Sequence, residues 1–193
     1  GVHPNENKSL STNLPIGRLP IPKKLVLPLR QHVGRVAKLK VKPGDQVLKG
    51  QIIAEADGNI SASIHAPTSG KILKISEEIL PHPSGLPDFC ITIEPDFKDT
   101  WIEKKPISWK KLDRTKLIEA LSQSGIVGLG GAVFPTHMKL KINQSQPINT
   151  LVINAAECEP FITCDDMLMR ERADEIIQGA LIAQTILGAK ECV

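Results

Sequence analysis

Apolar and polar positions alternate in short runs over residues 25–112, as they do in β-strands with one solvent-facing side. The clearest run places Val36, Leu39 and Val41 among three lysines. The sequences "KPGD", "KGQ" and "ADGN" separate the runs and are typical of tight turns. The pattern predicts a small all-β unit, preceded by an extended segment over residues 1–24.

The periodicity then changes to that of helices. Residues 114–124 carry apolar side chains on one face, Asp113 is a suitable N-cap, and Gly125 is suited to end the helix. The sequence therefore predicts a short helix immediately before a glycine-rich stretch.

A buried strand within residues 149–157 and a long amphipathic helix over residues 165–189 follow. The final "KECV" resembles the start of another strand. A strand followed by a helix predicts an α/β domain over residues 113–193. Because one or two strands cannot cover that helix, we expect this domain to be incomplete and the chain to be part of a longer protein.

Composition excludes several classes of function. The net charge is +3 without a basic block, aromatic residues make up only 3% and tyrosine is absent. A surface that stacks nucleic-acid bases is therefore not expected, and nucleic acid is not a predicted partner. No apolar run reaches the length of a membrane span, so we expect the chain not to cross a membrane directly.

The cysteines do not have the CxxC spacing of structural zinc or iron–sulfur sites. They are Cys90, Cys158, Cys164 and Cys192. We predict reduced thiols and no metal site in this part of the protein.

The sequence "GLGGAVFPT" raises the question of a phosphate site. Gly128 and Gly130 supply two positions of a dinucleotide fingerprint, but Val133 stands at the third, and the preceding segment is helical. Lys139 comes eight residues after Gly131, too far for a P-loop. A turn that only permits close packing is therefore an alternative to a phosphate-binding loop.

The sequence "NAAECEP" comes directly after the predicted strand, where polar residues of an α/β sheet face a ligand crevice. Asn154 offers a donor and an acceptor to a planar heterocycle. Glu157 and Glu159 suit ribose hydroxyls or a carboxamide. An acidic cluster at a helix start is the alternative, which we favour for Asp165 and Asp166 but not for the two glutamates.

The β unit resembles the lipoyl and biotinyl carrier family, whose fold is the barrel-sandwich hybrid, through "VKPGDQVLKGQIIAEADG" and "HAPTSGKILKI". Carriers present a modifiable lysine on the hairpin between these halves. Here no lysine lies between Lys49 and Lys71. We therefore expect a docking or spacer module without a covalent cofactor.

The pairing of "GLGGAVFPTHMKL" with "INAAECEPF" resembles the C subunit of the Rnf ion-translocating electron-transport complex. More distantly, it is similar to the flavin-bearing, NADH-oxidising subunit of respiratory complex I. The amino-terminal "GVHPNENKSLS" and the lysine-free carrier-like unit match the Rnf subunit. The resemblance implies an α/β Rossmann-like flavin/NADH-binding domain after the barrel-sandwich hybrid.

The same resemblance implies an oxidoreductase subunit that passes electrons from NADH through FMN to 4Fe-4S clusters, with the cluster cysteines beyond Val193. It also implies the other subunits of the Rnf membrane complex as partners. The implied location is peripheral, on the cytoplasmic side of the bacterial inner membrane.

Residue roles follow from the resemblance by position. The implied cofactor-binding residues are Gly128, Gly130, Gly131, Phe134, Lys139 and Asn154. The glycine backbone and Lys139 would hold the FMN phosphate, Asn154 would bond the isoalloxazine, and Phe134 would stack on the dinucleotide. Glu157 and Glu159 are the implied catalytic residues, which would orient the NADH ribose or nicotinamide.

Four positions depart from the pattern. Leu129 stands in place of an arginine, Val133 in place of a glycine, His137 in place of a small residue, and Ala156 in place of an aspartate of the complex I subunit. Two alternatives therefore stay open. One is a non-catalytic docking or scaffold subunit of an electron-transport complex, and the other is a soluble flavin NADH dehydrogenase or hydrogenase subunit.

Overall fold

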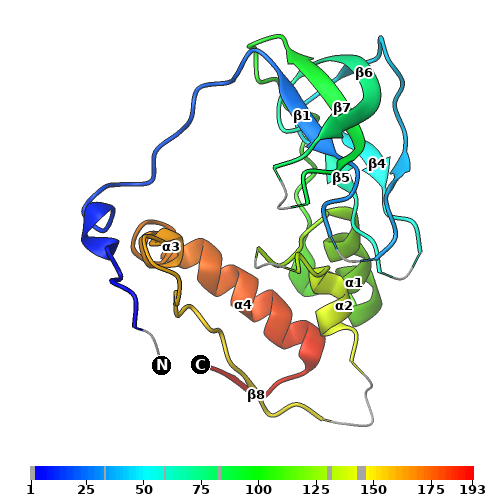
Figure 1. The fold of residues 1–193 in the computed structure, drawn as a ribbon. Helices are drawn as coiled ribbons and strands as arrows, with labels where there is room; N and C mark the ends of the chain where they lie inside the picture. The colour runs from blue at the N-terminus through cyan, green and yellow to red at the C-terminus, as the bar shows by residue number, and fades with distance from the viewer. Residues whose placement is uncertain (1–2, 33, 59, 82–83, 130–131, 143–146) are drawn as a thin grey trace. The chain divides into compact units, whose positions relative to one another are not determined.

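The computed structural model describes residues 3–32, 34–58, 60–81, 84–129, 132–142 and 147–193. The chain forms two compact units, which we describe separately (Figure 1). The barrel unit is Pro20–Ile142, and the terminal unit combines Gly1–Leu19 with Asn143–Val193. The domain limits expected from the sequence, at 24/25 and 112/113, stay a prediction.

The barrel unit contains two antiparallel sheets. One has the strand order β1 (Leu25–Pro28), β7 (Pro87–Pro95), β6 (Gly70–Ile79) and β3 (Gln46–Val47). The other has the order β2 (Lys38–Leu39), β4 (Ile52–Glu55) and β5 (Ile64–His65). Around the three lysines, the regular strand is limited to β2 and is therefore shorter than the alternating pattern predicted.

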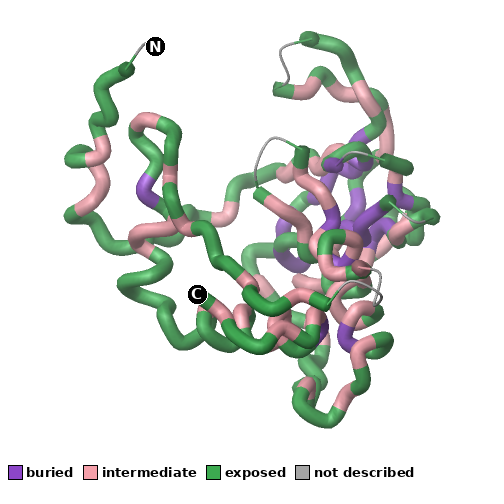
Figure 2. Tube along the Cα trace, turned by 90° about the horizontal axis from the view of Figure 1, so that it is seen from below, coloured by how far each residue is buried: buried purple, intermediate pink, exposed green. Residues whose placement is uncertain are grey.

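The barrel core is a cluster of buried apolar residues from both sheets. In Figure 2 buried residues, drawn in purple, gather in this unit. Ile72 on β6 pairs with Ile93 on β7, which also pairs with Leu25 on β1. Ile53 on β4 contributes from the second sheet, and Ile53, Ile72 and Ile93 have no exposed surface. These contacts account for the sandwich that the alternating pattern predicts.

The hairpin between β4 and β5, where carriers present their lysine, is bound to the preceding loop of the barrel unit. The Arg35 N–H donates to the Ile60 carbonyl at 2.9 Å, and the Ser61 hydroxyl donates to the Arg35 carbonyl at 3.0 Å. The Ala62 N–H donates to Nε2 of His32 at 3.0 Å. The part of the hairpin that leads into β5 is therefore held against the rest of the barrel unit.

Helices of the barrel unit follow the sheets along the chain. They are the 3₁₀ turn η2 (Trp109–Lys111), α1 (Arg114–Gln123) and α2 (Thr136–Leu140). The Asp113 carboxylate accepts the Lys116 N–H at 2.9 Å, which confirms the predicted N-cap. Gly125 follows the C-cap with φ of 65°, the left-handed conformation in which helices often end.

The terminal unit contains a βαβ arrangement. Its elements are the 3₁₀ turn η1 (Lys8–Leu10), β8 (Thr150–Leu151), α3 (Cys164–Glu171), α4 (Ala173–Leu187) and β9 (Glu191–Cys192). The strand predicted at "KECV" is present as β9, which pairs with β8 in parallel. Among the described residues of this unit, only Thr163 and Ile186 are buried.

The single helix predicted over residues 165–189 is wrong, because the structure has two. At Arg172 the backbone leaves helical geometry, with φ of −133°. Its N–H ends α3 by donating to the Leu168 carbonyl, and its carbonyl starts α4 by accepting from Glu175 and Ile176. Arg172 therefore belongs to the ends of both helices.

Candidate functional site

The glycine-rich loop is closed at its base like a small hairpin in the barrel unit. Val127 pairs with Pro135 in an antiparallel bridge, and the Gly128 N–H donates to the Phe134 carbonyl at 2.9 Å. Gly128 thus uses its own N–H within the loop, which differs from the expectation that it donates to a phosphate. Gly130 and Gly131 lie outside the described residues.

Lys139 on α2 lies beside this loop. A Cβ added to Gly128 would stand 2.7 Å from Nζ of Lys139 and 3.6 Å from the Phe134 carbonyl oxygen. The absence of a side chain at Gly128 therefore leaves room for an ammonium group against the loop backbone. An exposed cation held beside a glycine backbone is suited to bind an anion such as a phosphate.

The loop and the helix α2 that follows it carry three of the positions that depart from the family pattern. Val133, where a glycine is expected, has φ of 45°, a conformation that a β-branched residue adopts at a cost. Leu129, in place of an arginine, is 96% exposed, and His137 is buried in α2. The positive φ gives a physical reason for a glycine at position 133.

The segment "NAAECEP" lies in the terminal unit. Asn154 is exposed, and its Oδ1 accepts the Ala156 N–H at 3.0 Å. Glu159 is also exposed and makes no hydrogen bond or ion pair with the residues that the structure describes. Both side chains are therefore accessible from solvent.

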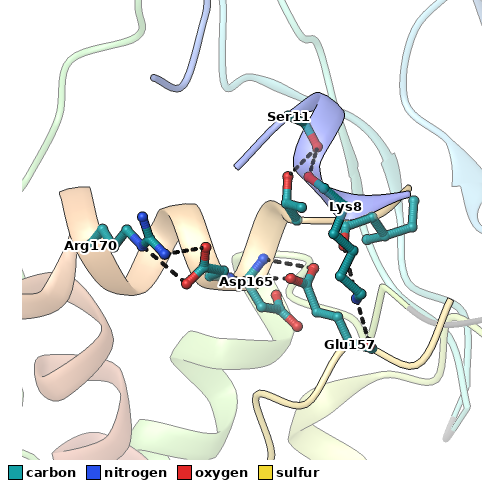
Figure 3. Close-up of polar contacts among 8 residues, drawn as sticks. Lys8, Ser11, Glu157, Asp165 and Arg170 are labelled. Atoms are coloured by element: carbon teal, nitrogen blue, oxygen red, sulfur yellow. Dashed lines mark hydrogen bonds and ion pairs between the residues drawn. The ribbon is translucent and has the colours of Figure 1, made fainter. Parts of the chain in front are cut away.

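Glu157 has a different environment, because its carboxylate caps the amino end of α3 (Figure 3). It accepts the N–H of Asp165 at 2.9 Å, the thiol of Cys164 at 3.2 Å and the N–H of Asp166 at 3.3 Å. The N–H of Asp165 contributes most to holding the pKa of Glu157 below its usual value of 4.5, and Lys8 adds a favourable charge.

This geometry corrects one expectation from the sequence. Asp165 and Asp166 lie in the first turn of α3, as the helix-start alternative expects for them. The expectation that Glu157 takes no part in that helix start is wrong, because its carboxylate caps the helix. A carboxylate that leaves the end of α3 would give up these hydrogen bonds. The two glutamates around Cys158 therefore have different structural roles.

Lys8 is a residue that sequence reasoning missed. Its ammonium donates to the Glu157 carbonyl at 2.6 Å and to the Ile162 carbonyl at 3.2 Å (Figure 3). It is 149 positions from Glu157 in the chain. A lysine in a polar amino-terminal segment gives no sequence signal for such a contact.

Glu157, Cys164 and Asp165 also place possible metal-ligating atoms within 4.8 Å of one another. The thiol and the Asp165 N–H are already bonded to the Glu157 carboxylate, and helix capping accounts for the grouping. We assign no metal to it. Among the residues described, none of the helices has both the length and the apolar character needed to cross a bilayer.

Comparison with known families gives two matches in succession. Residues 1–98 match the RnfC barrel sandwich hybrid domain, and residues 121–193 match the Nuo51 FMN-binding domain. The matches confirm the predicted fold class, a barrel-sandwich hybrid followed by a mixed α/β domain of the FMN-binding type. They also confirm the resemblance inferred from the two motifs.

Three relatives are each named as the C subunit of an ion-translocating oxidoreductase complex. The protein of Erwinia tasmaniensis is 46% identical over 191 residues, with 98% of this chain and 24% of the relative covered. That of Haemophilus influenzae strain Rd is 47% identical over 194 residues, covering 100% and 24%. That of Rhodobacter capsulatus is 45% identical over 192 residues, covering 99% and 37%. The chain spans between about a quarter and a little over a third of the length of these relatives.

Proposed function

Because the chain belongs to the RnfC barrel sandwich hybrid family, we propose that it is the amino-terminal part of the C subunit of an ion-translocating oxidoreductase complex. In this proposal the whole subunit takes electrons from NADH through FMN and delivers them to 4Fe-4S clusters beyond Val193. The observation that carries the proposal is the order of the two matched domains along one chain, with the glycine-rich loop inside the second.

The residues around the glycine-rich loop fit the phosphate of FMN. Lys139 supplies a positive charge in the space that Gly128 leaves open. Since the Gly128 N–H is bonded to Phe134, the phosphate-binding donors are assigned to the backbone of Gly130 and Gly131. When bound, FMN supplies hydride acceptance and one-electron release, while the protein supplies position and electrostatics.

The exposed polar residues of the other motif are assigned to the remaining contacts. Asn154 would hydrogen-bond the isoalloxazine, and Phe134 would stack on the dinucleotide. Glu159 would orient the NADH ribose or nicotinamide, because its carboxylate is exposed and has no partner among the described residues. Glu157 would act by fixing the path of this segment, since its carboxylate binds α3.

We assign the sheet-forming part of the barrel unit, residues 25–112, to docking within the complex. It has no lysine from residue 50 to residue 70, and its hairpin is bonded to the loop that contains Arg35. A swinging prosthetic arm would need both a lysine and a free hairpin. The other Rnf subunits are the proposed partners, and the cytoplasmic side of the inner membrane is the proposed location.

Flavin binding by the full-length protein tests the function. The visible absorption spectrum is recorded with and without added FMN, followed by anaerobic addition of NADH. Lys139→Met should weaken FMN binding about tenfold, as expected for losing one charge-assisted contact. Lys141→Met, at an exposed lysine that follows α2, is the matched control and should bind FMN like the wild type.

The second measurement concerns NADH. Glu159→Gln should retain FMN. Reduction of the bound FMN by NADH should slow about tenfold if roughly 1.4 kcal/mol of transition-state interaction is lost.

Equal FMN affinity of the wild type and Lys139→Met would show that the loop is a packing turn. The Gly128–Phe134 hydrogen bond and the strained Val133 favour a scaffold subunit without flavin as the second candidate, and failure of the wild type to bind FMN would support it.

A further inference from the structure

Part of the amino-terminal segment binds along the second motif and α3. We call residues 6–16 the N-terminal strap. The Glu6 carbonyl accepts the Phe161 N–H at 2.8 Å, and at the other end the Ile16 N–H donates to the Glu171 carboxylate at 2.9 Å. The strap therefore contacts both the loop that enters α3 and the last residue of that helix.

Lys8 closes the bend between Glu157 and Ile162. The ammonium group of Lys8 can only donate hydrogen bonds, and it donates to the carbonyls of both Glu157 and Ile162, the two ends of this bend. Next along the strap, the Ser11 hydroxyl donates to the Phe161 carbonyl at 3.4 Å and accepts from the Thr163 hydroxyl at 2.9 Å. The contacts thus surround the bend from its beginning to its end.

Phe161 shows why the bend needs support. Its φ is 68°, a left-handed conformation that is unfavourable for a residue other than glycine. Such conformations persist where surrounding structure holds them. The N–H of Phe161 bonds to Glu6 and its carbonyl to Ser11, so both of its peptide groups are bound by the strap.

We propose that the strap, through Lys8, is a positioning element for the NADH contact of the second motif. This inference rests on the proposed function. Glu159 lies inside the bend that Lys8 closes, and Glu157 fixes one end of that bend to α3. Lys8 touches no reacting atom; it fixes the backbone from which the Glu159 side chain projects.

The test uses Lys8→Met in the full-length protein, with Lys8→Arg as the conservative variant. Lys23→Met is the matched control, because Lys23 is exposed and has no polar partner among the described residues. We measure amide hydrogen exchange, FMN content, and the KM and kcat for NADH oxidation with an artificial electron acceptor.

Lys8→Met should raise exchange of the Phe161 and Asp165 amides about tenfold while leaving the amides of β6 and β7 unchanged. Its KM for NADH should rise about tenfold, with kcat changed much less and FMN content equal to the wild type. Lys8→Arg should have a KM for NADH close to that of the wild type, and Lys23→Met should behave like the wild type. Ser11→Ala, which removes weaker contacts, replaces Lys8→Met if that variant does not fold.

Unchanged exchange at Phe161 in Lys8→Met would overturn the proposal. Raised exchange with an unchanged KM would also overturn it, because the strap would then be structural alone. If the wild type binds no FMN or is not reduced by NADH, the proposed function fails and the NADH assignment fails with it. The exchange measurement still decides separately whether the strap holds the bend.

Discussion

Replacing Gly125 by alanine tests how α1 packs against the barrel. Gly125 follows the end of α1 with φ of 65°. An added Cβ would stand 2.4 Å from the Ser63 carbonyl oxygen and 3.0 Å from the imidazole of His65. The glycine is therefore required by its conformation and also by the close approach of the barrel strand β5.

The two effects can be separated within the same unit. The left-handed conformation costs an alanine roughly 1–2 kcal/mol, and overpacking against neighbouring atoms adds typically about 1–3 kcal/mol. Gly125→Ala should therefore lower the free energy of unfolding by about 2–5 kcal/mol. Gly85 has a similar φ of 62°, and apart from its chain neighbours no residue that the structure describes lies within 4 Å of its added Cβ. Gly85→Ala should therefore show the first effect alone.

Tryptophan fluorescence during urea denaturation measures the difference. Both tryptophans, Trp101 and Trp109, belong to the barrel unit, so their emission reports on its unfolding. With a urea dependence of roughly 1–3 kcal/mol per molar, the midpoint of Gly125→Ala should fall about 1 M below that of Gly85→Ala. Equal midpoints for the two variants would refute the packing of Gly125 against β5.

Two further predictions concern the two motifs. Val133→Gly removes the roughly 1–2 kcal/mol cost of a valine in the left-handed conformation but adds an entropic cost of about 0.5–1 kcal/mol for ordering a glycine backbone. The urea midpoint of unfolding should therefore rise modestly. A lower midpoint would show that Val133 is not strained. The pKa of folded Glu157 is depressed, so its stabilisation of α3 is complete above its unfolded value of 4.5 and is lost as the pH falls through the lower folded pKa. Exchange of the Asp165 amide, corrected for intrinsic rates, should accelerate in that acid range in the wild type. It should show no such step in Glu157→Gln; a step of the same size in both would exclude the cap.

Local signals in the sequence predicted much of the fold. The Asp113 cap, the Gly125 end and the "KPGD" turn each depend on residues a few positions apart, and all three form as expected. The barrel core followed from alternating apolar residues. Short-range patterns of this kind are visible without knowledge of the rest of the fold.

The break between α3 and α4 is harder to predict because the apolar periodicity continues across it. The break falls at Arg172, which is neither of the residues, glycine and proline, that usually signal the end of a helix. The acidic pair Asp174 and Glu175 in the first turn of α4 is the available sign of a second helix start. Because the apolar pattern is unbroken, Asp174 and Glu175 are equally compatible with one continuous helix. The structure adds an Arg172–Glu175 ion pair at the start of α4.

The two glutamates show why the candidate site could not be completed from the sequence. Glu157 and Glu159 are chemically equivalent and flank one cysteine, so composition cannot separate them. The N–H groups of α3 and the ammonium of Lys8 come from other segments, and they bind Glu157 while leaving Glu159 exposed. A carboxylate that caps a helix would lose those bonds by turning toward a ribose, whereas an exposed one loses mainly hydration. We therefore propose Glu159 for the NADH contact. Substitutions at the two positions should have different effects, Glu157 on local stability and Glu159 on reduction.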